Sequence, residues 1–252
     1  MGKLGAAVIW SSELDEDSLI NWATELRRDL ELEAAEVLES LVIDGDTATT
    51  TVTNINDIAG TPGGTEYYLV LNGFRKLALV TNTANSRSAG TLTVEDFIET
   101  IKLMGIAGKN AQFKDKVSFI LDPWTYMKAF ELSELKTNDV SAAPTIANGE
   151  LQRIYGYGII PTHNMHRFNT DTTYGLKANS AGKVDVDTAA NNLYGAILAV
   201  RWDQWMLGWK RRVKVETARV IRADATELAL TMRVGLIYRD TEASAISYGV
   251  TL

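Results

Sequence analysis

The sequence predicts an α+β protein in which a long helix packs on a sheet of long strands, with a run of shorter elements inserted between them. Near the N-terminus, apolar residues spaced by three or four positions keep one face of a helix apolar. Near the C-terminus, apolar residues alternate strictly with others, as in a half-buried strand. Short helical and strand-like segments lie between. The two series are Leu19, Ala23, Leu26, Leu30, Ala34, Val37 and Leu41, then Leu228, Leu230, Met232, Val234, Leu236 and Tyr238.

The composition is that of an ordinary globular protein and disfavours several classes. The chain has 252 residues, 46% hydrophobic and 23% charged, enough for one large domain or two modest ones. Its net charge of −7 disfavours a protein whose main role is to grip nucleic acid, because phosphate binding needs a basic excess. The sequence has no cysteine, which excludes disulfides and thiolate metal sites. No run approaches ~18 apolar residues, so no membrane span is expected.

The first segment is dominated by the predicted long helix. Residues 4–10 are strand-like, and the serines and acids that follow are typical of a helix start. The helix is expected over about 15–43, with Gly45 as its stop. At ~1.5 Å per residue this helix is roughly 40 Å long, enough to span a wide sheet. Residues 67–72 are a second strand candidate, and 81–91 are expected to be a loop.

The middle segment carries two clear helix starts. Thr93 to Asp96 forms a capping box for a helix that closes at Gly105. Asp122 as N-cap and Pro123 at the first helical position begin another helix, expected to reach residue 135. The remaining expectations are a buried strand at 116–122, a polar loop at 136–150, a strand at 154–164, a polar excursion at 166–192 and a strand at 195–201.

The last segment combines aromatic and basic residues with a predicted hairpin. Half of the six tryptophans fall within eight residues, namely Trp202, Trp205 and Trp209. Residues 202–208 are expected to form one or two helical turns, and an extended stretch begins at Trp209. The extended stretch that follows breaks its alternation near Thr217–Ala218, which predicts a β-bulge, and a turn is expected at 223–226. Aromatics beside cations are typical of a nucleic-acid platform or of a packed structural corner. We expect packing with salt bridges, and keep DNA contact as the alternative.

No pattern of catalytic or metal-binding residues emerges. The GIAGKN stretch at 105–110 lacks the spacing and the final Ser or Thr of a phosphate-binding loop. His163 and His166 are the only histidines, and no third ligand for a metal is evident. The Asp-rich turns at 44–46 and 185–187 lack the twelve-residue calcium-loop pattern. We therefore expect no enzyme activity, no metal and no cofactor.

Charge is distributed unevenly along the chain. Residues 1–60 hold thirteen acids and three bases, a net of −10, whereas 196–222 hold seven bases and two acids, a net of +5. Segments of opposite sign are expected to meet, within one chain or between chains. The expected contacts join the acids Glu31, Glu33, Glu36 and Glu39 to the bases Lys210, Arg211, Arg212 and Lys214.

Four segments, taken in order, resemble a known family. The first is the strand and long helix of 9–47; the second is LNGFRKLALV with TLTVEDFIETIKLM; the third is SFILDPWTYMKAFEL with LQRIYGYGIIPTHN; the fourth is 196–240. Together they cover most of residues 7–240. Their order and spacing resemble the major capsid proteins of tailed bacteriophages with the Hong Kong 97-like fold.

The resemblance implies a domain organisation. It implies a peripheral domain made from 1–90, with the long spine helix, and from 202–252, with a long β-hairpin. It implies an inserted axial domain at 91–201, with residues 136–149 as a mobile loop at its tip near the capsomer axis. Trp202, Trp205 and Trp209 would then pack at the junction of the two domains.

The resemblance also implies a function. It implies a major capsid protein that assembles in the host bacterial cytoplasm into pentamers and hexamers of an icosahedral virion shell around double-stranded DNA. Its partners would be further copies of itself, other head proteins and, weakly, the packaged DNA, with no membrane. The alternative within this fold is an encapsulin-like nanocompartment shell. Alternatives from other classes are an enzyme built around His163 and His166 and a monomeric binding module.

The sequence departs from the family at its N-terminus. Family members carry an N-terminal arm and an extended loop before the spine helix, and this sequence starts about where that loop would return. Some family members crosslink a lysine of this loop to an asparagine of a neighbouring subunit. Since this sequence lacks the region of that lysine, the resemblance assigns no crosslinking residues to it. We expect residues 1–252 alone to stay as monomers or small oligomers in dilute buffer, with closed shells needing the missing segments or a high local concentration.

Overall fold

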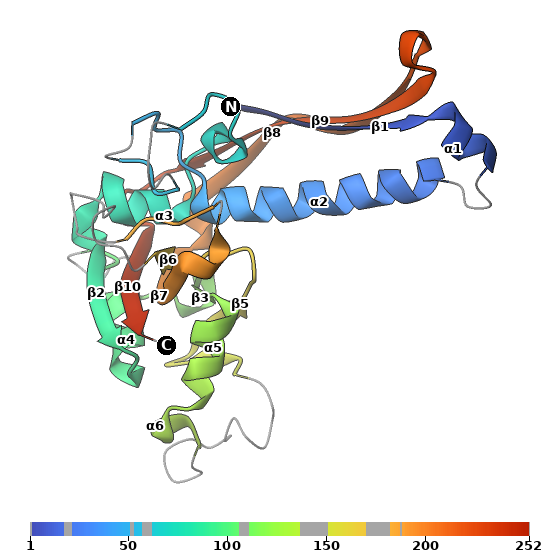
Figure 1. Cartoon of the computed structure of the whole chain (residues 1–252). Helices are drawn as coiled ribbons and strands as arrows, with labels where there is room; N and C mark the ends of the chain where they lie inside the picture. Colours follow the sequence, from blue (N-terminus) through green and yellow to red (C-terminus); the bar gives the residue numbers. More distant parts are fainter. Residues whose placement is uncertain are drawn as a thin grey trace.

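The computed structural model has two parts, an elongated arm and a compact body (Figure 1). It describes residues 2–17, 22–50, 53–56, 62–105, 111–136, 151–169, 182–186 and 188–251. The predicted loop at the tip of the middle segment lies, from residue 137 to 150, outside the described residues. No helix in the described ranges is long and apolar enough to cross a membrane.

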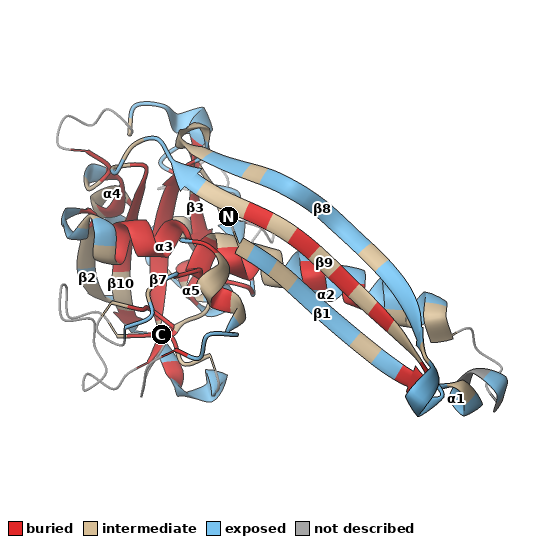
Figure 2. Ribbon diagram, turned by 90° about the horizontal axis from the view of Figure 1, so that it is seen from above, coloured by how far each residue is buried: buried red, intermediate tan, exposed pale blue. Residues whose placement is uncertain are grey.

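The arm is a three-stranded antiparallel sheet covered on one face by a long helix. The strands are β1 (Gly2–Ser11), β9 (Ala225–Tyr238) and β8 (Trp205–Val220), in the order β1-β9-β8. Helix α2 (Trp22–Asp44) lies along the sheet (Figure 2). Leu30 and Ala34 of the helix pack with Leu228, Leu230 and Met232 of β9. The expected helix-on-sheet arrangement is therefore present, and the alternating series marks the face of β9 that α2 covers.

The predicted N-terminal boundary of the long helix is wrong. Residues Ser12–Asp17 form a separate short helix, α1, which is not collinear with α2 (Figure 1). The Ser12 backbone N–H donates to the Asp224 carbonyl oxygen at 2.9 Å, and the Ser12 hydroxyl donates to the Asp224 carboxylate at 3.0 Å. These bonds hold α1 against the turn at the tip of the β8–β9 hairpin.

The hairpin is present, but its irregularities lie elsewhere than predicted. Pairing is regular around Thr217–Ala218, and the register instead shifts between Trp209 and Arg211 and again between Arg211 and Lys214. Most side chains of β8 are exposed, so alternation there carries little information about register. The expected turn is present, since β8 ends at Val220 and Asp224 adopts a left-handed conformation with φ of 43°.

The body is built on a seven-stranded mixed sheet. Its order is β2-β10-β7-β3-β5-β4, with β6 also paired to β7. The strands are β2 (Ser86–Thr91), β10 (Ser244–Thr251), β7 (Asn192–Arg201), β3 (Val117–Leu121), β5 (Tyr157–Pro161), β4 (Arg153–Ile154) and β6 (Phe168–Asn169). The central strand β7 is buried on both faces, as its continuous apolar run predicts.

Helices cover both faces of this sheet. Helix α4 (Val94–Lys102) and α5 (Pro123–Phe130) pack on one face, and α3 (Phe74–Lys76) with the turn that follows it packs on the other. Both predicted helix starts are confirmed. The Asp96 carboxylate accepts from the backbone N–H of Thr93 at 2.8 Å, and the Asp122 carboxylate accepts from two backbone N–H groups at 3.1 Å.

Several sequence-based expectations in this part were wrong. Residues 67–70 form a 3₁₀-helix rather than a strand, and the expected loop at 81–91 contains strand β2. The helix expected to reach residue 135 is divided into α5 and the short α6 (Ser133–Lys136). Each of these segments is short, and its state depends on the neighbours it packs against.

The position of the C-terminal strand β10 was not predicted from the sequence. It pairs with β7 and with β2 in the sheet of the body, and not with the hairpin that precedes it. By strand pairing, residues 244–251 therefore go with the middle segment rather than with the rest of 202–252. The division into peripheral and axial domains stays a prediction.

Candidate functional site

The tryptophan segment packs where the arm joins the body. The helical turns expected at 202–208 are wrong beyond Gln204, since Trp202 lies in a short 3₁₀ turn and Trp205 already begins strand β8. Both rings meet Phe74 edge to face, with centroid distances of 5.6 and 4.7 Å. Trp205 also meets Tyr238 at 5.7 Å. Such pairs stabilise a junction by their buried area and geometry. Trp209 lies on β8 and is 39% exposed.

A buried ionic cluster lies beside this junction, at the end of α2. Arg75 Nη1 donates to Asp44 Oδ1 at 2.6 Å, and His166 Nδ1 lies 3.0 Å from Asp44 Oδ2. The Arg75 guanidinium also sits 4.1 Å over the Phe168 ring. Burial by itself raises the pKa of Asp44, but the charge of Arg75 and the hydrogen bonds with His166 and Arg75 outweigh burial and hold this pKa below its ordinary value. The cluster joins α2, α3 and the segment before β6.

A second buried pair lies two residues further along the chain. Lys76 Nζ donates to Asp46 Oδ2 at 2.8 Å and to the Thr53 carbonyl oxygen at 2.6 Å. Burial raises the pKa of Asp46 despite the neighbouring Lys76. Neither pair was predicted from the sequence. Their signal is the Asp-Gly-Asp turn at 44–46 combined with an Arg-Lys pair inside an otherwise apolar segment at 74–80.

Three of the acidic and basic residues singled out from the sequence have other partners within the chain. Glu31 pairs with Arg27 at 3.0 Å, and Lys214 pairs with Glu216 at 2.6 Å. The Glu39 carboxylate accepts from Thr162 and Asn164 of the body at 2.6 and 2.9 Å. Glu33 and Glu36 are exposed on α2.

The basic run lies on the edge strand of the arm. Arg211 and Lys214 stand opposite Arg233 and Thr231 of β9, on the sheet face away from α2. Lys210 and Arg212 lie at the two register shifts and have no cross-strand partner on β9. Arg211 and Lys214 therefore face away from their own α2, and a contact between these two bases and the acids of α2 would have to join two copies.

The two histidines do not form a metal centre within the described residues. No group of three or more histidine, cysteine, aspartate or glutamate side chains gathers there in a way that could hold a metal ion. His166 is bound to Asp44, whereas His163 is exposed. The described geometry therefore assigns His166 to the ionic cluster at the junction.

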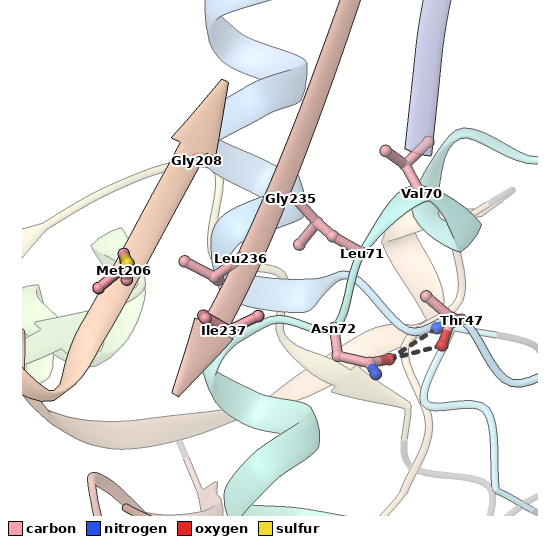
Figure 3. Close-up of a pocket in the computed structure, with 9 residues that line it drawn as sticks. All are labelled: Thr47, Val70, Leu71, Asn72, Met206, Gly208, Gly235, Leu236 and Ile237. Atoms are coloured by element: carbon pink, nitrogen blue, oxygen red, sulfur yellow. Dashed lines mark hydrogen bonds between the residues drawn. The ribbon is translucent and has the colours of Figure 1, made fainter. Parts of the chain in front are cut away.

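A shallow cavity of about 260 Å³ lies between the hairpin and the segment Val70–Asn72 (Figure 3). Gly208 and Gly235 face each other across β8 and β9, as do Met206 and Ile237. The Asn72 side-chain oxygen accepts two hydrogen bonds from Thr47, each of 2.9 Å. None of the lining residues is ionisable, so the cavity offers contact area and no titratable acid or base.

Comparisons with known proteins find similar structures but no similar sequences. No protein-family model matches the chain, and no curated protein matches it. The mature capsid of bacteriophage PhiM1 matches with a TM-score of 0.61 at 11% identity, covering 97% of this chain and 70% of that chain. The capsid of the cyanophage P-SCSP1u matches with a TM-score of 0.61 at 13% identity, covering 100% and 73%.

A cellular shell protein matches as well. The holo-SrpI encapsulin complex from Synechococcus elongatus PCC 7942 has a TM-score of 0.55 at 12% identity, covering 99% of this chain and 74% of that chain. At such identities the likeness establishes the fold alone. This chain has the fold of subunits that build phage capsids and an encapsulin.

Proposed function

We propose that this protein is the major capsid protein of a tailed bacteriophage, a structural shell subunit without a chemical step. The observation that carries the proposal is the fold match to chains of phage capsids over 97–100% of this chain. Copies would associate by surface complementarity into pentamers and hexamers of an icosahedral shell around double-stranded DNA.

The shape of the arm supports assembly through extended contacts. Strand β8 is an edge strand with most of its side chains exposed, and α2 presents exposed acids on its far side. Exposed edges and complementary charges are features through which neighbouring copies recognise each other. We propose that Lys210 and Arg212 at the irregular edge of β8 face Glu33 and Glu36 of an adjacent copy. Contacts with other head proteins and weak contacts with DNA belong to the same proposal.

Electron microscopy and light scattering over a wide range of concentrations test the proposal. The expected result is capsomers of five or six copies, or closed particles, that increase with protein concentration. A protein that stays monomeric up to ~1 mM would be an enzyme or a binding module instead, and the proposal would be wrong.

An encapsulin-like nanocompartment is the second candidate, because the SrpI encapsulin shares the fold over 99% of this chain. The contents of particles isolated from cells that produce the protein with its native neighbours separate the two. Particles that protect long double-stranded DNA from nuclease support the capsid. Particles that hold an enzyme and no DNA support the nanocompartment.

A further inference from the structure

Three cations stand side by side across the outer face of the arm, the face away from α2. The register places Lys3 of β1 opposite Arg233 of β9, and Arg233 opposite Arg211 of β8. Lys214, opposite Thr231, is the next residue along the same face of β8. We call the group made of these three cations and Lys214 the cationic row (Lys3, Arg211, Lys214 and Arg233). These residues come from three distant parts of the sequence, and only strand pairing brings them together.

The cationic row lacks a full set of partners within the chain. Like charges directly opposite each other on a sheet are destabilising. Glu216, opposite Ala229, follows Lys214 on the same face of β8 and forms an ion pair with Lys214 at 2.6 Å. Arg233 Nε and Thr231 Oγ1 are buried and have no hydrogen-bond partner among the described residues. An anionic group from outside the chain would supply the missing negative charge beside these cations.

The surface around the cationic row is flat enough to accept another element. Gly5 and Ala7 of β1 and Ala229 of β9 lie on the same face, beside the row. Gly5 and Ala7 are exposed. Such small side chains leave the backbone of a docked segment room to approach, so that its acids can reach the row.

The element with the complementary charge is α1, at the far end of the arm. Its sequence SELDED has four acids in six residues, and Glu13, Leu14 and Glu16 are exposed. Its bonds to Asp224 hold it at the tip of the hairpin. From Lys3 to Ser12 the strand is about 30 Å long at ~3.3 Å per residue, so α1 cannot reach the cationic row of its own chain.

We infer that α1 of one copy docks on the cationic row of a neighbouring copy. The tip of each arm would then lie on the end of the neighbouring arm that joins its body. The inference rests on the proposed function, since it names a contact between copies of a self-assembling subunit. Such a head-to-tail contact uses two different surfaces and closes into a ring when its rotation permits. The overall charge of −7 favours an acidic protein segment over nucleic acid as the occupant.

Disulfide trapping tests the contact directly, because the chain has no cysteine of its own. The variant pairs Gly5→Cys beside the row with Leu14→Cys on α1. A side chain at Gly5 meets only ordinary contacts, at 3.5 Å or more, and Leu14 is 42% exposed. Oxidation should give a ladder of covalently linked copies, since the two positions are too far apart to bond within one chain. Leu14→Cys with the exposed Lys102→Cys on α4 is the matched control and should give no ladder.

Charge reversal adds a second readout. Lys3→Glu with Arg211→Glu should lower the yield of the ladder about tenfold, because several exposed ion pairs are lost together. Adding Glu13→Lys with Glu16→Lys should restore it. Circular dichroism of each variant confirms that it is folded.

Electron microscopy of the same samples separates the two ideas. Assembled protein without the ladder, or with a ladder that charge reversal leaves unchanged, overturns the docking of α1 and leaves the proposed function standing. Protein that forms no oligomer even at ~1 mM overturns the proposed function. Charge reversal that weakens binding to a DNA column while the ladder persists assigns the cationic row to nucleic acid, and the inference is then wrong.

Discussion

Arg75 is the residue whose removal should cost the fold most, because it neutralises a buried carboxylate. Its side chain is fully buried, and the side chain of its partner Asp44 is only 3% exposed. A buried charge left without its partner destabilises a protein far more than a broken surface pair does. Phe168 adds a cation–π contact on one face of the guanidinium.

Replacing this arginine should therefore lower the free energy of unfolding by ~3 kcal/mol or more. The variant is Arg75→Met, measured by urea denaturation near neutral pH. Arg27→Met is the matched control, since Arg27 pairs with Glu31 on the surface and should cost at most ~1 kcal/mol. Equal losses in the two variants would show that the buried pair contributes nothing special.

The two buried aspartates predict opposite contributions to acid sensitivity. The pKa of Asp44 is lowered from 3.8, so its stabilisation is complete above that pH and is lost as the pH falls toward the folded value. The pKa of Asp46 is raised, so the folded state takes up this proton more readily and gains stability as the pH falls. Asp44→Asn should flatten the loss of stability below pH ~4, and Asp46→Asn should steepen it. Urea unfolding between pH ~2.5 and ~6 measures both slopes, and identical slopes in both variants would contradict the assignment.

At the scale of elements, the end of α2 is held by a close approach of two backbone segments. Gly45 N–H donates to the Leu41 carbonyl oxygen at 2.9 Å, which closes the helix where the sequence predicted its stop. Gly73 N–H then donates to the Gly45 carbonyl oxygen at 2.8 Å. A Cβ atom at Gly73 would lie 2.5 Å from the Ile43 carbonyl oxygen. Only glycine fits at this point without moving the start of α3.

Gly73→Ala should therefore lower the free energy of unfolding by ~2 kcal/mol or more and reduce the melting temperature. The clash is with backbone, which cannot rotate away as a flexible side chain would. Gly64→Ala is the control, because nothing lies within 4 Å of its added methyl group. That variant should change the stability by at most ~0.5 kcal/mol. A tolerated alanine at Gly73 would mean that the two segments are more loosely packed than described.

At the scale of the whole molecule, the arm carries acids on the exposed side of α2, and the cations Arg211 and Lys214 lie on the opposite face of the sheet. Lys214 pairs with Glu216 within its own chain, so the bases of β8 that we expect to face the α2 acids of a neighbour are Lys210 and Arg212. Association driven by exposed charges weakens with salt, because the Debye length falls from ~10 Å at 0.1 M to ~3 Å at 1 M.

Lys210→Glu with Arg212→Glu should therefore reduce assembly, measured by sedimentation velocity at low salt. Adding Glu33→Lys with Glu36→Lys should restore it, since the charges are then exchanged and not lost. Raising the salt should bring the unaltered protein and the first variant together. Reduced assembly that the second pair does not rescue would place the partners of β8 elsewhere.

The sequence by itself determined those features that depend on near neighbours or on burial of one face. The alternation from Leu228 to Val234 identified the face of β9 that α2 covers. Asp122 followed by Pro123 located the start of α5, because capping uses atoms only two or three residues apart. The order of the four segments predicted the fold, which the structural likeness to phage capsid chains supports.

Only the tertiary structure decided what depends on partners far along the chain. It placed β10 in the sheet of the body, and it buried Arg75 against Asp44 across 31 positions of sequence. It also turned Arg211 and Lys214 away from α2 and set Arg211 in line with Arg233 and Lys3. The physical reason is strand register: shifting a pairing by one residue sends every side chain to the opposite face. The composition of a segment determines its charge, whereas strand register determines on which face of the sheet that charge lies.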